Sequence, residues 1–170
     1  MPKIIENARD QLLAEAKRQI IENGYAATTV RSVAGALGIG VGTVYNYFES
    51  KEMLIATFVF EDWKRYLAYM SGLPTDDSYK LLNGIYGALQ SFAKENEALF
   101  SDPDASRTVS AGISARHKIL REQISEFVLP VCYEAFDAEF VSEALICWSM
   151  DGKKFDTVYP LIKKLIKNNI

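Results

Sequence analysis

Apolar side chains recur at steps of three and four residues along almost the whole chain, which is the spacing of one face of an α-helix. The first such stripe consists of Ile5, Ala8, Leu12, Ala16 and Ile20. No run shows the sustained apolar-polar alternation of a half-buried strand. The pattern therefore predicts an all-α fold of eight or nine helices.

Residues that favour turns divide this pattern into separate helices. Asn23-Gly24 is expected to end the first helix, because glycine tolerates the left-handed conformation that closes one. Short helices are then predicted at about 30–37, with Thr29 as its N-cap, and at about 41–48, and Ser50 can cap a long fourth helix. Breaks at 71–75, 101–104, Pro130 and 151–152 separate the remaining helices, which are expected at about 82–92, 106–130, 138–150 and 155–166.

The stretch from Gly24 to Leu54 carries the most specific pattern in the chain. Its two short helices are joined by Gly38-Ile39-Gly40, and such a turn can set two helices at a steep angle, as in a helix-turn-helix. Val44 and Phe48 lie one turn apart and are expected to pack in a core. Two short helices around a glycine turn also occur in plain helical bundles, so spacing alone leaves DNA binding and a structural role open.

The second short helix combines small, uncharged and hydroxyl-bearing residues. With Val44 and Phe48 inside, Thr43 and Tyr45 are left on or near the free surface, where hydroxyl groups suit base edges and phosphate oxygens. Aromatic hydroxyls facing solvent favour the DNA-binding interpretation. Tyr47 could pack its ring and still present its hydroxyl group, so both roles remain open for it.

The order of residues in this stretch resembles the DNA-binding signature of the TetR family of transcriptional regulators. The matching elements follow one another without gaps over roughly the first third of the chain: Gly24-Tyr25, Thr28-Thr29-Val30, Val33-Ala34, Leu37-Gly38-Ile39, Gly42-Thr43-Val44-Tyr45, Tyr47-Phe48 and Ser50-Lys51-Glu52 with Leu54. The resemblance implies a three-helix helix-turn-helix domain over residues 1–50. It also implies a helical effector-binding and dimerisation domain over residues 51–170.

The function implied by this resemblance is transcriptional regulation. The chain would be a ligand-responsive repressor that binds a palindromic operator as a homodimer, with a small apolar or aromatic molecule as its effector. A DNA-binding co-activator and a helical protein-interaction module on the same fold are the alternatives. The resemblance also implies a role for each matching residue. Phosphate contacts would come from Thr29, Arg31, Tyr45, Tyr47 and Lys51, and the major groove would be faced by Val41, Gly42, Thr43 and Asn46.

The charge of the chain limits how it could bind DNA. The formal net charge is −3, and over residues 1–52 six basic side chains balance six acidic ones. Val41 stands where members of the family often carry a lysine or another polar residue, so the expected recognition helix has no charge. We therefore expect few neutralised phosphates and a shallow salt dependence, and Val41 could meet a thymine methyl group.

Two further sets of apolar residues are candidates for a dimer interface and an effector pocket. The last two helices could pack inside one subunit, but the resemblance implies that they pair with their mates in a four-helix bundle. The interface candidates are Phe140, Leu145, Trp148, Phe155, Val158, Leu161, Ile162 and Leu165. The middle helices are rich in aromatic residues, each of which alone could be ordinary core. The pocket candidates are Phe58, Trp63, Tyr66, Tyr86, Phe92 and Phe100.

Other classes of protein find little support in the sequence. A single histidine and the lack of a glycine-rich phosphate loop argue against an enzyme, and no cofactor or metal site is expected. Cys132 and Cys147 are expected as buried thiols in a reducing compartment. No stretch has the length and apolarity of a membrane span or a signal peptide, so we expect a cytoplasmic protein.

Overall fold

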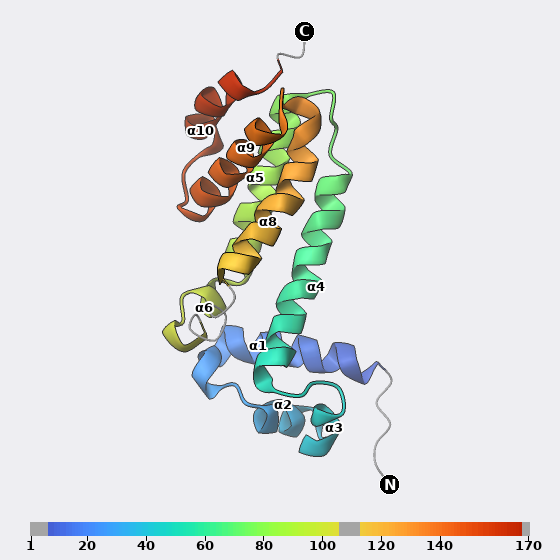
Figure 1. Cartoon of the computed structure of the whole chain (residues 1–170). Helices are drawn as coiled ribbons and strands as arrows, with labels where there is room; N and C mark the ends of the chain where they lie inside the picture. The colour runs from blue at the N-terminus through green and yellow to red at the C-terminus, as the bar shows by residue number, and fades with distance from the viewer. Residues whose placement is uncertain (1–6, 106–112, 168–170) are drawn as a thin grey trace. The chain divides into compact units, whose positions relative to one another are not determined.

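The computed structural model describes residues 7–105 and 113–167, and its regular elements there are helices (Figure 1). The exception is one isolated antiparallel bridge between Cys132 and Ile166. The all-α prediction is therefore confirmed. Ile5, at the start of the first stripe, and Ser106, the expected start of a long helix, lie outside the described residues.

The N-terminal helices follow the expected order, with two differences at their ends. They are α1 (Ala8–Ala27), α2 (Val30–Leu37), α3 (Val41–Tyr45) and α4 (Lys51–Ser71). The helical conformation is interrupted at Gly24, where φ is 81°, as the sequence predicts, but a further helical turn follows, so that α1 as a whole extends to Ala27. The α3 helix is shorter than expected, and Asn46, Tyr47 and Phe48 lie beyond its last turn.

The C-terminal half consists of longer helices joined by short connections. They are α5 (Ser78–Glu95), α6 (Glu97–Phe100), α8 (Ile113–Val128), η1 (Leu129–Val131), α9 (Ala135–Met150), α10 (Phe155–Ile162) and η2 (Lys163–Leu165). The short α6 is absent from the sequence-based prediction. The α9 helix begins three residues earlier than expected, and this brings Phe136 onto it.

Contacts within the chain divide it into two compact units. Unit 1 comprises Met1–Trp63 and Asn96–Ala111, and unit 2 comprises Lys64–Glu95 and Gly112–Ile170. This division differs from the boundary expected after residue 50. The first part of α4 belongs to unit 1 because Leu54, Ile55 and Phe58 are buried in its core.

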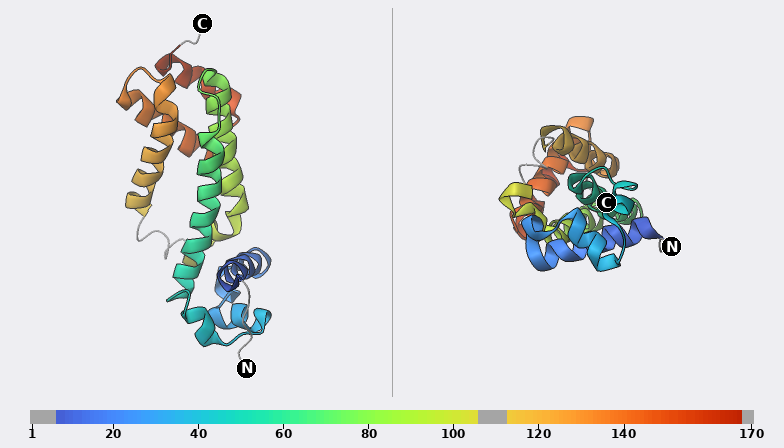
Figure 2. Two further views of the ribbon diagram at one scale, coloured as in Figure 1. Left: turned by 90° about the vertical axis from the view of Figure 1, so that its right-hand side faces the viewer. Right: turned by 90° about the horizontal axis from the view of Figure 1, so that it is seen from below.

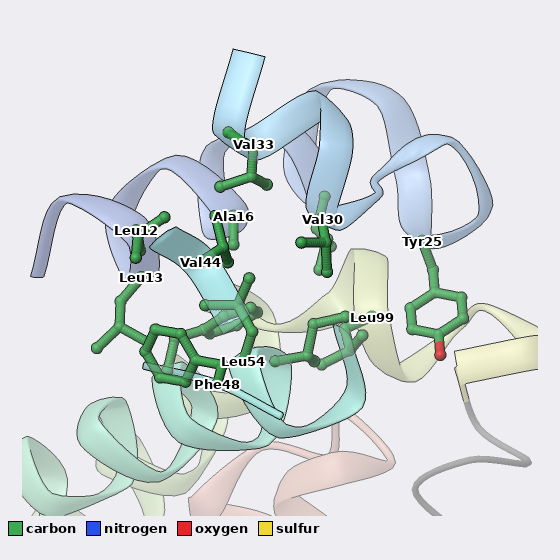
Figure 3. Close-up of a cluster of buried hydrophobic side chains, with 14 of the residues drawn as sticks. Leu12, Leu13, Ala16, Tyr25, Val30, Val33, Val44, Phe48, Leu54 and Leu99 are labelled. Carbon is green, nitrogen blue, oxygen red and sulfur yellow. The ribbon is translucent and has the colours of Figure 1, made fainter. Parts of the chain in front are cut away.

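The core of unit 1 draws side chains from five helices. Figure 3 shows Leu12 and Ala16 of α1, Val33 of α2, Leu54 of α4 and Leu99 of α6 directed into one cluster. Helices as short as α2 and α3 cannot form a core alone, so their stability depends on this burial. A segment distant in sequence therefore helps to hold the helix-turn-helix together.

Unit 2 is organised around α9, which packs against both α8 and α5 (Figures 1 and 2). An aromatic cluster fixes α10 on α5, with the rings of Tyr79 and Tyr159 in edge-to-face contact at 4.8 Å between centroids. The ring of Phe155 lies 5.4 Å from Tyr86, whose hydroxyl group donates to the Lys153 carbonyl at 2.9 Å. The last helix is therefore anchored within its own subunit.

Gly38 and Gly35 form a matched pair for testing the turn, because a Cβ atom added at either meets no other atom within 4 Å. Gly38 has a φ of 65°, whereas Gly35 lies within α2. We expect Gly38→Ala to lower the free energy of unfolding, measured with urea, by about 1–2 kcal/mol. Gly35→Ala should raise it by up to about 1 kcal/mol. Equal effects of the two substitutions would contradict this account of the turn.

Candidate nucleic-acid interface

The start of α2 is fixed by a reciprocal capping box. The Thr29 hydroxyl oxygen accepts from the Ser32 backbone N–H at 3.0 Å, and the Ser32 hydroxyl oxygen accepts from the Thr29 backbone N–H at 2.9 Å. The expected cap role of Thr29 is confirmed. Thr29 and Arg31 are both exposed here, and a hydroxyl group that accepts one hydrogen bond can still donate another.

The turn between α2 and α3 depends on Gly38, which adopts the left-handed conformation. Its N–H donates to the Gly35 carbonyl, and the Ile39 N–H donates to the Ala34 carbonyl. These bonds satisfy the last carbonyl groups of α2 and redirect the chain within two residues. The α3 helix then begins at Val41, after Gly40.

The α3 segment has one buried and one open side. Val44 is completely buried and Phe48 nearly so, which confirms both as core residues (Figure 3). On the open side, Tyr45 and Tyr47 are 52% and 49% exposed. Gly42 and Asn46 are exposed as well, while Val41 and Thr43 are half-buried.

This open side can approach another surface closely. A side chain at Gly42 would meet nothing within 4 Å, so the glycine leaves free space at the beginning of α3. Hydroxyl groups, one amide and an apolar Val41 side chain are the functional groups available there. Val41 also packs partly against the core, so only part of its surface is open.

Lys51 occupies a different environment from the other predicted contact residues. Its ammonium group donates a hydrogen bond to the Tyr25 carbonyl oxygen and lies 3.7 Å from the centroid of the Tyr25 ring. Burial lowers the pKa of the ammonium group, against the opposing effect of the Glu52 and Asp102 carboxylates. The sequence did not predict this contact between the end of α1 and the start of α4.

Most basic side chains in the described part of unit 1 are engaged by carboxylates. Arg9 pairs with Glu61 at 3.1 Å, and Lys17 pairs with Asp62 at 2.5 Å. Arg18 is paired as well, with carboxylates of its own helix. Within residues 7–63 and 96–105, Arg31 is the basic side chain for which the structure gives no partner.

The structure places the six pocket candidates in both units. Phe58, Trp63 and Phe100 belong to unit 1, where Phe58 is part of the core. In unit 2, Tyr86 is buried against the Lys153 carbonyl. Tyr66 and Phe92 are brought together, with 5.8 Å between their ring centroids in an edge-to-face contact.

The interface candidates separate into buried and exposed residues. Leu145, Phe155, Val158 and Ile162 are buried within the subunit, and Leu165 is half-buried. In contrast, Phe140 and Leu161 are 55% and 67% exposed, and Trp148 is exposed too. Phe136 is 71% exposed on the same helix as Phe140. It is not among the predicted interface residues, because the sequence pattern predicts that this helix begins only at about residue 138.

Glu143 is half-buried on α9, three positions after Phe140 and four positions before Cys147. Both its carboxylate oxygens lie 2.9 Å from His117 Nε2, and the Cys147 thiol donates to it at 3.3 Å. Burial raises the pKa of Glu143, but these hydrogen bonds and the charges of His117 and Arg121 bring it below its usual value. Cys147 is exposed, so the expectation of two buried thiols holds for Cys132 alone.

None of the described helices combines the length and apolarity needed to cross a lipid bilayer.

Comparison with known proteins identifies the N-terminal segment. The family model described as bacterial regulatory proteins, tetR family, matches residues 12–57. The HTH-type transcriptional repressor KstR2 of Mycolicibacterium smegmatis is 40% identical over 57 residues, which are 32% of this chain and 28% of that protein. The HTH-type transcriptional regulator UidR of Escherichia coli is 33% identical over 60 residues, which are 35% of this chain and 31% of that protein. The chain thus matches less than a third of the length of each of these two relatives.

Solved structures extend the likeness to the whole fold. A transcriptional regulator from Rhodococcus sp. Rha1 has a TM-score of 0.62 at 18% identity, with 90% of this chain and 87% of that chain covered. The multidrug binding protein EbrR, in complex with imidazole, has a TM-score of 0.63 at 15% identity, with 96% and 92% covered. At these identities the likeness concerns the fold alone. The findings therefore show a segment, residues 12–57, that matches the tetR family of bacterial regulatory proteins, within a chain that shares its fold with solved transcriptional regulators.

Proposed function

We propose that this chain is a transcriptional repressor that binds a palindromic operator as a homodimer and responds to a small molecule. One observation carries the DNA-binding part of this proposal. The α3 segment buries Val44 and Phe48 and leaves Tyr45 and Tyr47 half exposed, within the stretch that matches known repressors. A helical protein-interaction module would not require aromatic hydroxyl groups on the open side of so short a helix.

In this proposal α3 enters the major groove and α2 contacts the backbone beside it. Tyr45 and Tyr47 place their hydroxyl groups on phosphates, and Thr29 and Arg31 do so from the start of α2. Thr43 and Asn46 contact base edges, and the open part of Val41 meets a thymine methyl group. Gly42 allows the backbone to approach the DNA without hindrance.

The dimer is proposed to form through α9 and the neighbouring surface of α10. The large apolar side chains of α9 occur on every side of the helix. This pattern is typical of a helix that is buried all round. Val141 and Leu145 are buried in the subunit, whereas Phe136 and Phe140 are mostly exposed. Glu143 is satisfied within its own subunit, which reduces the free-energy cost of burying that carboxylate in an interface.

The fold and one aromatic contact support the proposed response to an effector. The neighbour EbrR is described as a multidrug binding protein, and this chain shares its fold. Tyr66 and Phe92, two pocket candidates of unit 2, lie in edge-to-face contact. An aromatic or apolar molecule would bind beside these rings, between α4 and α5.

Selection of bound sequences from random duplex DNA tests the DNA-binding proposal. We expect a two-fold symmetric motif with half-sites about one helical turn, ~34–36 Å, apart. Tyr45→Ala should weaken binding to the selected duplex about tenfold, as loss of a phosphate-directed hydroxyl group requires, and should leave folding intact. Tyr69→Ala, at a similarly exposed tyrosine of unit 2, serves as the control. Failure to enrich any sequence would exclude this function.

The dependence of DNA affinity on salt concentration tests our expectation that few basic side chains contact phosphates. With Arg31 neutralising one phosphate in each subunit, the logarithm of the association constant should fall against log salt with a slope of about −2. Arg31→Ala should reduce the slope to near zero. A wild-type slope steeper than about −6 would mean that other cations leave their carboxylate partners to bind DNA.

Substitutions at equally exposed aromatic residues test the dimer. Phe140 on α9 and Tyr69 on α4 are each 55% exposed. Phe140→Glu should raise the dimer dissociation constant by at least roughly 30-fold, which corresponds to about 2 kcal/mol, because it places a charge in an apolar interface. Tyr69→Glu should change it little. A wild-type monomer at micromolar concentration in sedimentation velocity would overturn the proposed dimer.

A further inference from the structure

Lys51 is the first residue of α4, where a positive charge is unfavourable because the amino-terminal end of a helix is itself partly positive. Its side chain extends away from that end to the last turn of α1. There the ammonium group donates to the Tyr25 carbonyl oxygen and lies over the Tyr25 ring, which is itself buried. Two separate interactions with Tyr25 therefore hold the Lys51 ammonium group in place.

The last turn of α1 needs such a partner. The final carbonyl groups of a helix lack intrahelical donors and carry partial negative charge. The last turn of α1 contains no basic residue of its own. One of its carbonyl groups, that of Gly24, accepts from the Thr28 hydroxyl group at 2.9 Å, and Lys51 supplies the donor for Tyr25 from another helix.

The contact between Lys51 and Tyr25 joins the two ends of the segment that forms the helix-turn-helix. Tyr25 and Lys51 enclose residues 26–50, which contain the whole of α2 and α3. A bond between them closes the base of the helix-turn-helix as a loop and fixes where that loop leaves α1 and returns to α4. Glu52 strengthens the junction, since its carboxylate accepts from the Tyr25 hydroxyl group at 3.5 Å.

We propose that Lys51 is a positioning residue that clamps the base of the helix-turn-helix to Tyr25, and that it is not a ligand for DNA phosphate. This inference rests on the proposed function, and it revises the phosphate role that the family resemblance implies for this lysine. Moving the ammonium group to a phosphate would break both the carbonyl bond and the contact with the ring.

The test compares Lys51→Met with Tyr25→Leu in the full chain. Both variants weaken the clamp. Lys51→Met deletes the charge and with it both contacts, and Tyr25→Leu deletes the ring beneath the charge and leaves the backbone carbonyl. Tyr25→Phe is the matched control, because it keeps the ring and removes only the hydroxyl group that donates to Glu52 at 3.5 Å. Lys51→Arg keeps a cation that can occupy the same place, and it should fold if Lys51→Met does not. Affinity for the duplex selected by the wild-type chain is measured at several salt concentrations.

We expect Lys51→Met to weaken DNA binding about tenfold while the slope against log salt stays at the wild-type value, because no phosphate contact is lost. Tyr25→Leu should produce a similar loss, and the double variant should be little worse than either single one. Lys51→Arg and Tyr25→Phe should bind within about threefold of the wild type.

A slope that becomes shallower by about 2 in Lys51→Met, one phosphate for each subunit, would overturn the clamp and restore the phosphate role. Additive effects of the two substitutions would overturn it too. Unfolding in urea without DNA tests the clamp independently of the proposed DNA binding. If the wild-type chain selects no duplex, the clamp still predicts that Lys51→Met and Tyr25→Leu lower the free energy of unfolding non-additively, and additive or absent effects would refute it.

Discussion

The helix-turn-helix of unit 1 depends on burial of Val44 and Phe48, which anchor α3, a helix too short to be stable alone. The α3 helix has five residues and no side-chain cap, so its orientation comes from packing rather than from its own hydrogen bonds. The receiving core is formed by Leu12 and Ala16 of α1, Val33 of α2, Leu54 of α4 and Leu99 of α6. Because the inner side of α3 is fixed in this way, the side that carries Tyr45 and Tyr47 is fixed as well.

Few basic side chains in the described part of unit 1 are available to bind phosphate. The described basic residues of unit 1 are mostly committed to carboxylates, as in the Arg9–Glu61 and Lys17–Asp62 pairs. Lys51 is held at Tyr25, and Arg31 is exposed at the start of α2. Such a surface gains little from general attraction to the phosphate backbone, so the affinity of the proposed complex must come largely from close fit and hydrogen bonds.

Sequence reasoning predicted the helix-turn-helix well because its signals are local. Gly38 in the left-handed conformation, Thr29 as a cap and Val44 with Phe48 one turn apart are all properties of adjacent residues. What it missed required contacts between distant segments. The burial of Leu99 in unit 1 and the Lys51–Tyr25 contact join parts of the chain whose pairing no local period encodes. The same holds for α9, whose large apolar residues occur on every side of the helix and so do not indicate which of them face inward.

The central claim is that the open side of α2 and α3 is the surface that contacts DNA. Hydrogen–deuterium exchange of the full chain, with and without the duplex that it selects, tests this claim most directly. The account predicts that DNA slows amide exchange in residues 29–47 and leaves exchange in α9 unchanged. Protection of α9, or of the outer side of α5, with no change in residues 29–47 would contradict it.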